Sequence, residues 1–174
     1  MKKETFCRYI RQYETDMFRF AKSIVGNQAD GEDAMQESIL KAYEKIDTLR
    51  SRRKFKAWIF QILANECYQI LRSRKRQELT DPFEFTQQEH SYAFNDDWAA
   101  DIESGDGEIL SYILKMPKQH QEVLILYYYD EFSTKEIAKI LDIPQGTVKS
   151  RLARGRKQLK DLLEMEGEGA YEGA

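Results

Sequence analysis

Apolar residues recur every three to four positions through most of the first 76 residues. This spacing puts them on one face of a helix and predicts helices over 6–24, 35–46 and 55–71. The first helix is expected to end near Gly26, and the third at the basic run 72–76, because cations favour a helix C-terminus. The predicted inner faces are Phe6, Ile10, Tyr13, Met17, Phe20, Ala21 and Ile24, then Met35, Ile39, Ala42, Tyr43 and Ile46, and finally Phe55, Trp58, Ile59, Ile62, Leu63, Cys67, Ile70 and Leu71.

A capping motif and a proline mark further helices in the C-terminal part of the chain. Ser133 precedes Glu136 by three positions, which predicts a capping box at the start of a short helix over 134–141. Pro144 has no N–H to satisfy and therefore suits the start of the next helix, expected over 145–163. Together the two helices and their tight turn predict a helix-turn-helix.

The segment between the two helical blocks loses the helical period. Residues 77–106 are rich in Asp, Glu, Gln and Ser, and they include aromatic residues expected to pack on a flanking domain or to dock on a basic partner. We therefore predict an all-α protein with two small helical domains, 1–76 and 107–163, joined by an acidic, mostly irregular linker over 77–106. Residues 164–174 are predicted to form an acidic flexible tail.

The formal net charge of -3 hides a segregation of charge along the chain. Residues 1–76 carry +7 and residues 115–160 carry +5, whereas residues 77–114 carry -10 and residues 161–174 carry -5. Each helical block is thus basic by itself. Near-neutrality of the whole chain therefore does not exclude a nucleic-acid partner.

Composition excludes several other classes of protein. No apolar run reaches the roughly 18 residues that a membrane helix needs, and the N-terminus lacks the apolar core of a secretory signal. Cys7 and Cys67 cannot form a disulfide framework, and with His90 and His120 they lack the spacing of metal ligands. We expect a cytoplasmic protein without a cofactor or a metal site.

The second helix of the predicted helix-turn-helix carries residues suited to reading DNA. An α-helix fits the major groove, where Arg can donate two hydrogen bonds to guanine. A glycine at the helix start lets the backbone approach a phosphate, whose charge the helix N-terminus favours. The candidate DNA-binding residues are Gly146, Thr147, Lys149, Ser150, Arg151 and Arg154.

Segments in both helical blocks resemble one family. The runs 133–141, 146–152 and 154–159 are similar to region 4.2 of bacterial RNA polymerase sigma factors of the extracytoplasmic-function (ECF) group. In the N-terminal block, 33–38 resembles region 2.2 of this group, and 55–59 resembles region 2.3. The following residues Ile62, Ala64 and Asn65 extend the similarity into region 2.4, so the motifs occur in the family's order.

This resemblance implies a non-catalytic subunit that directs promoter-specific initiation by RNA polymerase. The implied partners are the β′ clamp helices and β flap of core polymerase, promoter DNA and an anti-sigma factor. Asp33, Gln36 and Glu37 match the residues that bind the clamp helices. The recognition helix matches the reader of the minus-thirty-five element. The minus-ten element and strand opening are assigned to the loop before the third helix and to that helix, with Leu49, Arg50, Arg52, Arg53, Asn65, Gln69 and Arg72 as candidates.

Two features stay open on the sequence. Phe55 and Trp58 could stack on unpaired bases, but they are expected in the core. The acidic linker resembles in role the family's segment that threads toward the polymerase active centre, or it is a solvated tether.

A dimeric helix-turn-helix regulator that binds an operator is the alternative reading. A regulator of this kind predicts a two-fold site bound by the protein alone, whereas a sigma factor predicts an asymmetric promoter bound with core polymerase. A DNA-processing enzyme is disfavoured, because the sequence assembles no cluster of metal-binding carboxylates, His or Cys.

Overall fold

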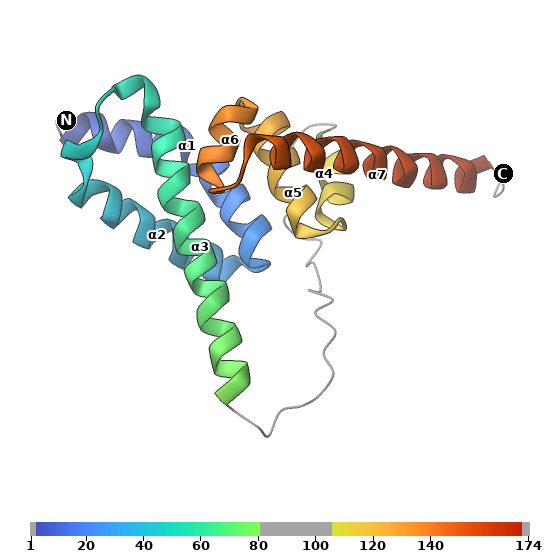
Figure 1. Ribbon diagram of the computed structural model, residues 1–174, viewed down its shortest axis with the longest axis horizontal. Helices are drawn as coiled ribbons and strands as arrows, with labels where there is room; N and C mark the ends of the chain where they lie inside the picture. Colours follow the sequence, from blue (N-terminus) through green and yellow to red (C-terminus); the bar gives the residue numbers. More distant parts are fainter. Residues whose placement is uncertain (1–2, 81–105, 172–174) are drawn as a thin grey trace. The chain divides into compact units, whose positions relative to one another are not determined.

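The computed structural model describes residues 3–80 and 106–171, which form helices and turns and contain no strand (Figure 1). They belong to two compact units, an N-terminal and a C-terminal one, each described here by itself. The predicted all-α class with two helical domains is confirmed. Most of the predicted acidic linker, residues 81–105, lies outside the described residues.

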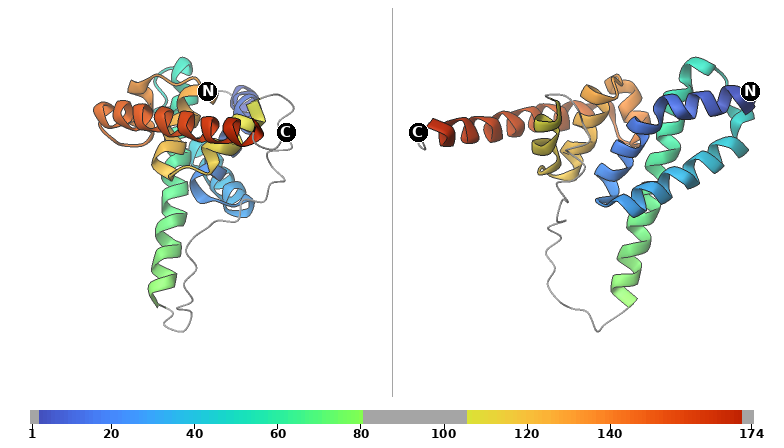
Figure 2. Two further views of the ribbon diagram at one scale, coloured as in Figure 1. Left: turned by 90° about the vertical axis from the view of Figure 1, so that its right-hand side faces the viewer. Right: turned by 180° about the vertical axis from the view of Figure 1, so that it is seen from behind.

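The N-terminal unit is built on three long helices, each of which packs against the other two (Figures 1 and 2). The first, α1 (Lys3–Val25), ends as predicted at Gly26, whose φ of 83° is the left-handed conformation that glycine adopts at little cost. The next helix, α2 (Gln28–Glu44), is capped at its start by Asn27, whose side chain accepts a hydrogen bond of 2.9 Å from the Asp30 N–H.

The third helix is longer than the sequence pattern predicts. Two 3₁₀ turns, η1 (Ile46–Thr48) and η2 (Arg52–Lys54), lead into α3 (Phe55–Thr80). Its last turns run on past the ends of α1 and α2 (Figures 1 and 2). The expected end at 72–76 was therefore wrong. No glycine or proline stops the helix before Pro82.

Aromatic side chains form the centre of the N-terminal core. Phe20, Phe55 and Phe60 are almost completely buried. The ring of Tyr9 stacks on Phe55 with centroids 4.9 Å apart, and Trp58 lies beside Phe55 at 5.9 Å. Phe55 is thus a core residue, as expected, whereas Trp58 is only half-buried.

The inner face of α2 differs from the one predicted from its large apolar residues. Tyr43 is 48% exposed and Leu40 is 61% exposed, and of the predicted inner face only Ala42 is buried. Small side chains pack inward instead, because they let α2 approach α1 closely: a Cβ atom on Gly31 would lie 3.5 Å from the backbone nitrogen of Lys22. The buried residues of α2 are Gly31, Ala34, Ser38 and Ala42.

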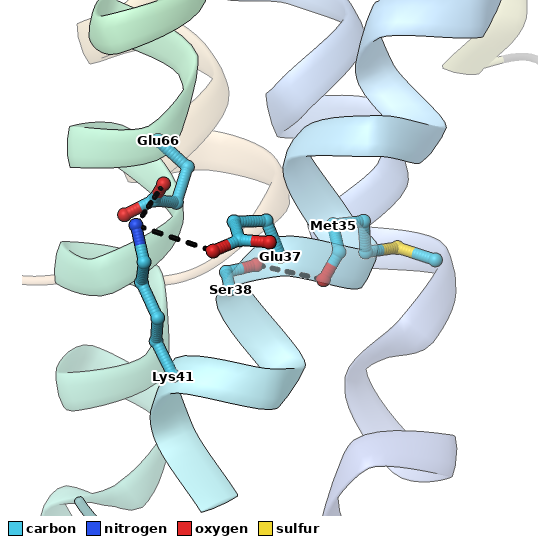
Figure 3. Close-up of polar contacts among 5 residues, drawn as sticks. All are labelled: Met35, Glu37, Ser38, Lys41 and Glu66. Atoms are coloured by element: carbon cyan, nitrogen blue, oxygen red, sulfur yellow. Dashed lines mark hydrogen bonds and ion pairs between the residues drawn. The ribbon is translucent and has the colours of Figure 1, made fainter. Parts of the chain in front are cut away.

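An ion pair joins α2 to α3 (Figure 3). Lys41 Nζ lies 2.7 Å from Glu66 Oε2 and 3.4 Å from Glu37 Oε1. The Glu66 side chain is 8% exposed and that of Lys41 30%, so the ammonium compensates a carboxylate that has lost most of its water. The hydrogen bond to Glu66 raises the pKa of Lys41 above its usual 10.5.

The C-terminal unit contains shorter helices and one long one. The turn between α6 and the preceding π-helix carries the predicted capping box, in which Ser133 and Glu136 bond each other's backbone N–H. Pro117, which lies directly before α5, separates α4 from α5. The elements are α4 (Asp106–Leu114), α5 (Lys118–Leu124), the π-helix η4 (Ile125–Tyr129), α6 (Thr134–Ile140) and α7 (Gln145–Tyr171).

The long helix α7 continues beyond its predicted end at 163, so the expected flexible tail is helical over 164–171. Glu, Met and Ala in this stretch are good helix formers, although Gly167 and Gly169 are not, and Lys160 and Glu164 form an exposed pair at 3.5 Å one turn apart. Near its middle, α7 packs tightly on α5. A Cβ atom on the buried Gly155 would lie 3.1 Å from Leu124 Cδ1.

We predict opposite effects of alanine at two glycines of α7. Alanine favours a helix over glycine at both, but Gly155→Ala forces the buried Leu124 to move, whereas a Cβ atom on Gly146 meets nothing within 4 Å. The free energy of unfolding should therefore be lower for Gly155→Ala than for Gly146→Ala by about 1–3 kcal/mol. Urea unfolding of both variants measures this, and equal stabilities would show that the helices do not pack as closely as described.

Lys41→Met should lower the free energy of unfolding by about 1–3 kcal/mol, less than for a fully buried pair because Lys41 is partly exposed. Lys45, an exposed lysine near the end of α2, provides the control: the free energy of unfolding of Lys45→Met should stay within about 0.5 kcal/mol of the wild-type value. Because folding raises the pKa of Lys41, its contribution is complete below pH 10.5 and is lost as pH rises through the folded-state value. The urea midpoints of the wild type and Lys41→Met should therefore converge as the pH rises above 10.5. A gap that stays constant would contradict a stabilising ion pair between Lys41 and Glu66.

Candidate functional site

The six candidate DNA-binding residues lie together in the first three turns of α7. Val148 and Leu152 are buried between them and fix which side of α7 faces outward. Of the candidates, Gly146, Lys149, Ser150 and Arg154 are exposed, and Thr147 and Arg151 are half-buried. The structure therefore brings the predicted recognition residues to one end of one helix.

The turn before α7 holds that helix start in place. Pro144 O accepts hydrogen bonds from the N–H groups of Thr147 at 3.0 Å and Val148 at 3.2 Å. Gln145 Nε2 donates to Thr134 Oγ1 at 2.8 Å, which ties the first turn of α7 to the first turn of α6. Space beside Gly146 is open, so a phosphate could approach the backbone there.

Farther along α7, Arg156 is held by two tyrosines. Its Nε donates a 2.6 Å hydrogen bond to the Tyr128 hydroxyl, and its guanidinium carbon lies 5.3 Å and 5.6 Å from the ring centres of Tyr127 and Tyr128. The sequence pattern did not predict this arrangement. The π-helix η4 that carries both tyrosines gave no recognised sequence signal.

A hollow of about 350 Å³ opens beside Tyr128. Leu159 and Leu163, one helical turn apart on α7, supply much of its apolar lining, and Leu163 is 39% exposed. The continuing apolar spacing beyond Leu152 was the sequence signal for this face. The lining residues are Tyr128, Arg156, Leu159, Lys160, Leu163 and Glu164.

In the N-terminal unit, α2 and α3 enclose a groove of about 490 Å³. The three residues predicted to bind core polymerase are exposed and all line it. Glu37 and Glu66, which both line the groove, form ion pairs with the same lysine, Lys41 (Figure 3). Its lining, which is rich in carboxylates, consists of Asp30, Asp33, Ala34, Gln36, Glu37, Leu40, Glu66, Gln69, Ile70 and Ser73.

The minus-ten candidates occupy two places. Leu49, Arg50 and Arg52 surround a hollow of about 270 Å³ formed by the loop between η1 and η2, together with Ile46, Asp47 and Ser51. Arg53 is exposed in the adjoining turn. The other three, Asn65, Gln69 and Arg72, lie on the exposed side of α3 at helical spacing, and the structure does not bring them into the loop hollow. Gln69 lines the α2–α3 groove instead.

Two other kinds of site are absent from residues 3–80 and 106–171. No helix there is long and apolar enough to cross a membrane. Within the same two ranges, no group of three or more His, Cys, Asp or Glu side chains is placed to hold a metal ion.

Comparison with known proteins identifies the family. The family model for sigma-70 region 2 matches residues 9–77, and that for sigma-70 region 4 matches residues 106–159. The chain is 32% identical to the ECF RNA polymerase sigma factor SigW of Bacillus subtilis over 91% of each chain. It is 30% identical to the RNA polymerase sigma factor SigV of the same organism over 90% of each chain.

A solved structure extends this similarity to the fold. The sigma factor RpoE of Bartonella quintana, solved with the anti-sigma factor NepR, matches with a TM-score of 0.71 at 27% identity, covering 92% of this chain and 98% of that one. Both helical units thus have their counterparts in one family, in the same order along the chain. The chain belongs to the ECF RNA polymerase sigma factors.

Proposed function

We propose that this ECF sigma factor uses three separate surfaces in promoter-specific initiation. The start of α7 reads the minus-thirty-five element, the loop before α3 captures the minus-ten element, and the α2–α3 groove binds core polymerase. The observation that carries the proposal is the groove, because all three expected polymerase-binding residues line it. The protein itself is non-catalytic: it selects the promoter, and polymerase supplies the chemistry.

On α7 the proposed contacts divide by position. Lys149 and Arg154 project from the exposed side and are proposed to reach base edges in the major groove, with Ser150 and Arg151 beside them. Gly146 and Thr147 lie at the helix start, where backbone N–H groups and the helix dipole favour a phosphate. Lys149 and Arg154 would then specify the DNA sequence, and Gly146 and Thr147 would set the register of the helix on the duplex.

The loop hollow suits an unpaired base. Single-stranded DNA binds where bases find a hollow or a stacking surface and cations follow the backbone. We place a non-template base in the hollow, with Arg50, Arg52 and Arg53 on its phosphates. Asn65 and Arg72 would meet the strand along α3. Gln69 lies between this surface and the polymerase groove, which it lines.

The groove suits a basic partner. Asp33 and Glu37 are exposed carboxylates beside the Gln36 amide, and Leu40, 61% exposed, adds an apolar contact at the same edge. A partner helix with basic and apolar side chains fits this combination. The β′ clamp helices are the proposed occupant.

The apolar hollow of the C-terminal unit is proposed to receive the β flap. Leu159 and Leu163 give the hollow apolar lining, and the cations Arg156 and Lys160 line it as well. Since RpoE of Bartonella quintana was solved with an anti-sigma factor, we also propose an anti-sigma factor as a partner of this chain.

Transcription in vitro with purified core polymerase tests the proposed function. A library of genomic fragments should yield discrete transcripts that depend on the added protein, and footprints should be asymmetric and require core polymerase. A two-fold symmetric footprint made by the protein alone, without initiation, would instead support the dimeric regulator.

Arg154→Ala should reduce initiation at the cognate promoter on the order of 10- to 100-fold, the effect of losing one two-bond contact to a base. Binding to core polymerase should not change, because Arg154 lines neither the α2–α3 groove nor the hollow at Leu159 and Leu163, the two surfaces proposed for core polymerase. Lys115→Ala, an exposed lysine outside α7, is the control. Run-off transcription and core titration measure the two effects. Lost core binding with retained promoter choice would contradict the assignment of α7 to DNA.

Asp33→Lys or Glu37→Lys should weaken binding to core polymerase by about tenfold or more, since a like charge then faces a basic partner. Glu32→Lys is the matched control, because Glu32 is an exposed carboxylate on α2 that does not line the groove. Affinity is measured by titrating labelled protein with core enzyme. Equal affinities for all three variants and the wild type would remove the groove from the polymerase interface.

A further inference from the structure

One cation of the basic run 72–76 contacts the other two helices of the N-terminal unit. Arg74 Nη1 donates a 2.9 Å hydrogen bond to Val25 O in the last turn of α1. Its other terminal nitrogen forms an ion pair with Asp30 Oδ2 in the first turn of α2. A single guanidinium on α3 therefore holds the end of α1 and the beginning of α2.

The carboxylate that Arg74 binds is itself part of the cap of α2. Asn27 Nδ2 donates to Asp30 Oδ2 at 3.1 Å, and Asn27 Oδ1 accepts from the Asp30 N–H at 2.9 Å. Gly26 supplies the reversal of the chain with its φ of 83°. These contacts fix where α2 begins and how it leaves the turn.

The neighbours of Arg74 in the sequence do not share its position. Arg72, Lys75 and Arg76 are exposed, whereas the Arg74 side chain is 27% exposed. From the sequence alone all four belong to one basic run. In the structure Arg74 differs from the others, because both terminal nitrogens of its guanidinium bind groups of the N-terminal unit itself.

The same contact lies next to the proposed polymerase site. Asp30 lines the α2–α3 groove, and Asp33, Gln36 and Glu37 follow it within the next two turns of α2. Because a helix is stiff over two turns, a shift of its first turn moves these three side chains together relative to α3.

We propose that Arg74 is a positioning residue for polymerase binding: by bridging Val25 O and Asp30, it sets the start of α2 and hence the place of the groove's carboxylates on α3. The inference rests on the proposed function of the groove. The planar guanidinium suits the role because its fork reaches two acceptors at once, which a lysine ammonium on a flexible stem does less well.

The test uses the full chain with Arg74→Met, Arg74→Lys and, as the matched control, Lys75→Met. Thermal unfolding first defines a temperature at which every variant is folded, so that a changed affinity is not a loss of folded protein. At that temperature Arg74→Met should raise the Kd for core polymerase about tenfold, Arg74→Lys should lie between it and the wild type, and Lys75→Met should stay within about twofold. Transcript yield should return to the wild-type level when core polymerase is saturating, because the DNA contacts are intact.

A double-mutant cycle checks that Arg74 acts through its partner. The combined effect of Arg74→Met and Asp30→Asn on the Kd should be smaller than the product of the two single effects. An unchanged Kd in Arg74→Met, or a yield that stays low at saturating core polymerase, would overturn the proposal. If Glu37→Lys weakens binding and Arg74→Met does not, the groove assignment stands and only the positioning role fails; if neither does, the groove assignment fails first.

Discussion

The close packing of α2 on α1 and α3 is the constraint on which the N-terminal unit depends. Small side chains at Gly31, Ala34, Ser38 and Ala42 let the backbones approach, so α2 contributes little large apolar surface to the core. Its position relative to α3 must then be fixed by directional contacts, which the Lys41–Glu66 pair provides. A helix held in this way keeps its larger and charged side chains for the outside, where the groove lies.

Cations have more than one role in this protein. The basic loop before α3 and the start of α7 present exposed arginines and lysines, the requirement for binding a polyanion. Arg74, Arg156 and Lys41 instead satisfy groups of the protein itself: a helix end and a carboxylate, a tyrosine hydroxyl, and a nearly buried glutamate. A count of basic residues therefore overstates the DNA-binding surface of both units.

Local signals predicted much of the fold and of the recognition helix. The capping box at Ser133 and the end of α1 at Gly26 depend on neighbours within a few residues, and both are confirmed. The inner face of α2 was predicted wrongly, because a pattern of large apolar residues cannot reveal helices that pack closely through small side chains. The ends of α3 and α7 were placed too early, since charge was read as a stop. In fact α3 continues to Thr80 with no glycine or proline before Pro82, and α7 continues through Gly167 and Gly169.

The helices, the basic character of each unit and the family could be predicted before the fold was known, because periodicity, composition and motif spacing depend only on the order of residues in the chain. Tertiary structure decided which side chains meet. Only the folded unit shows that Asp33, Gln36 and Glu37 share a groove with Gln69, or that Arg74 and Asp30 form an ion pair. These residues are far apart along the chain, and contacts between helices depend on packing distances that no local pattern encodes.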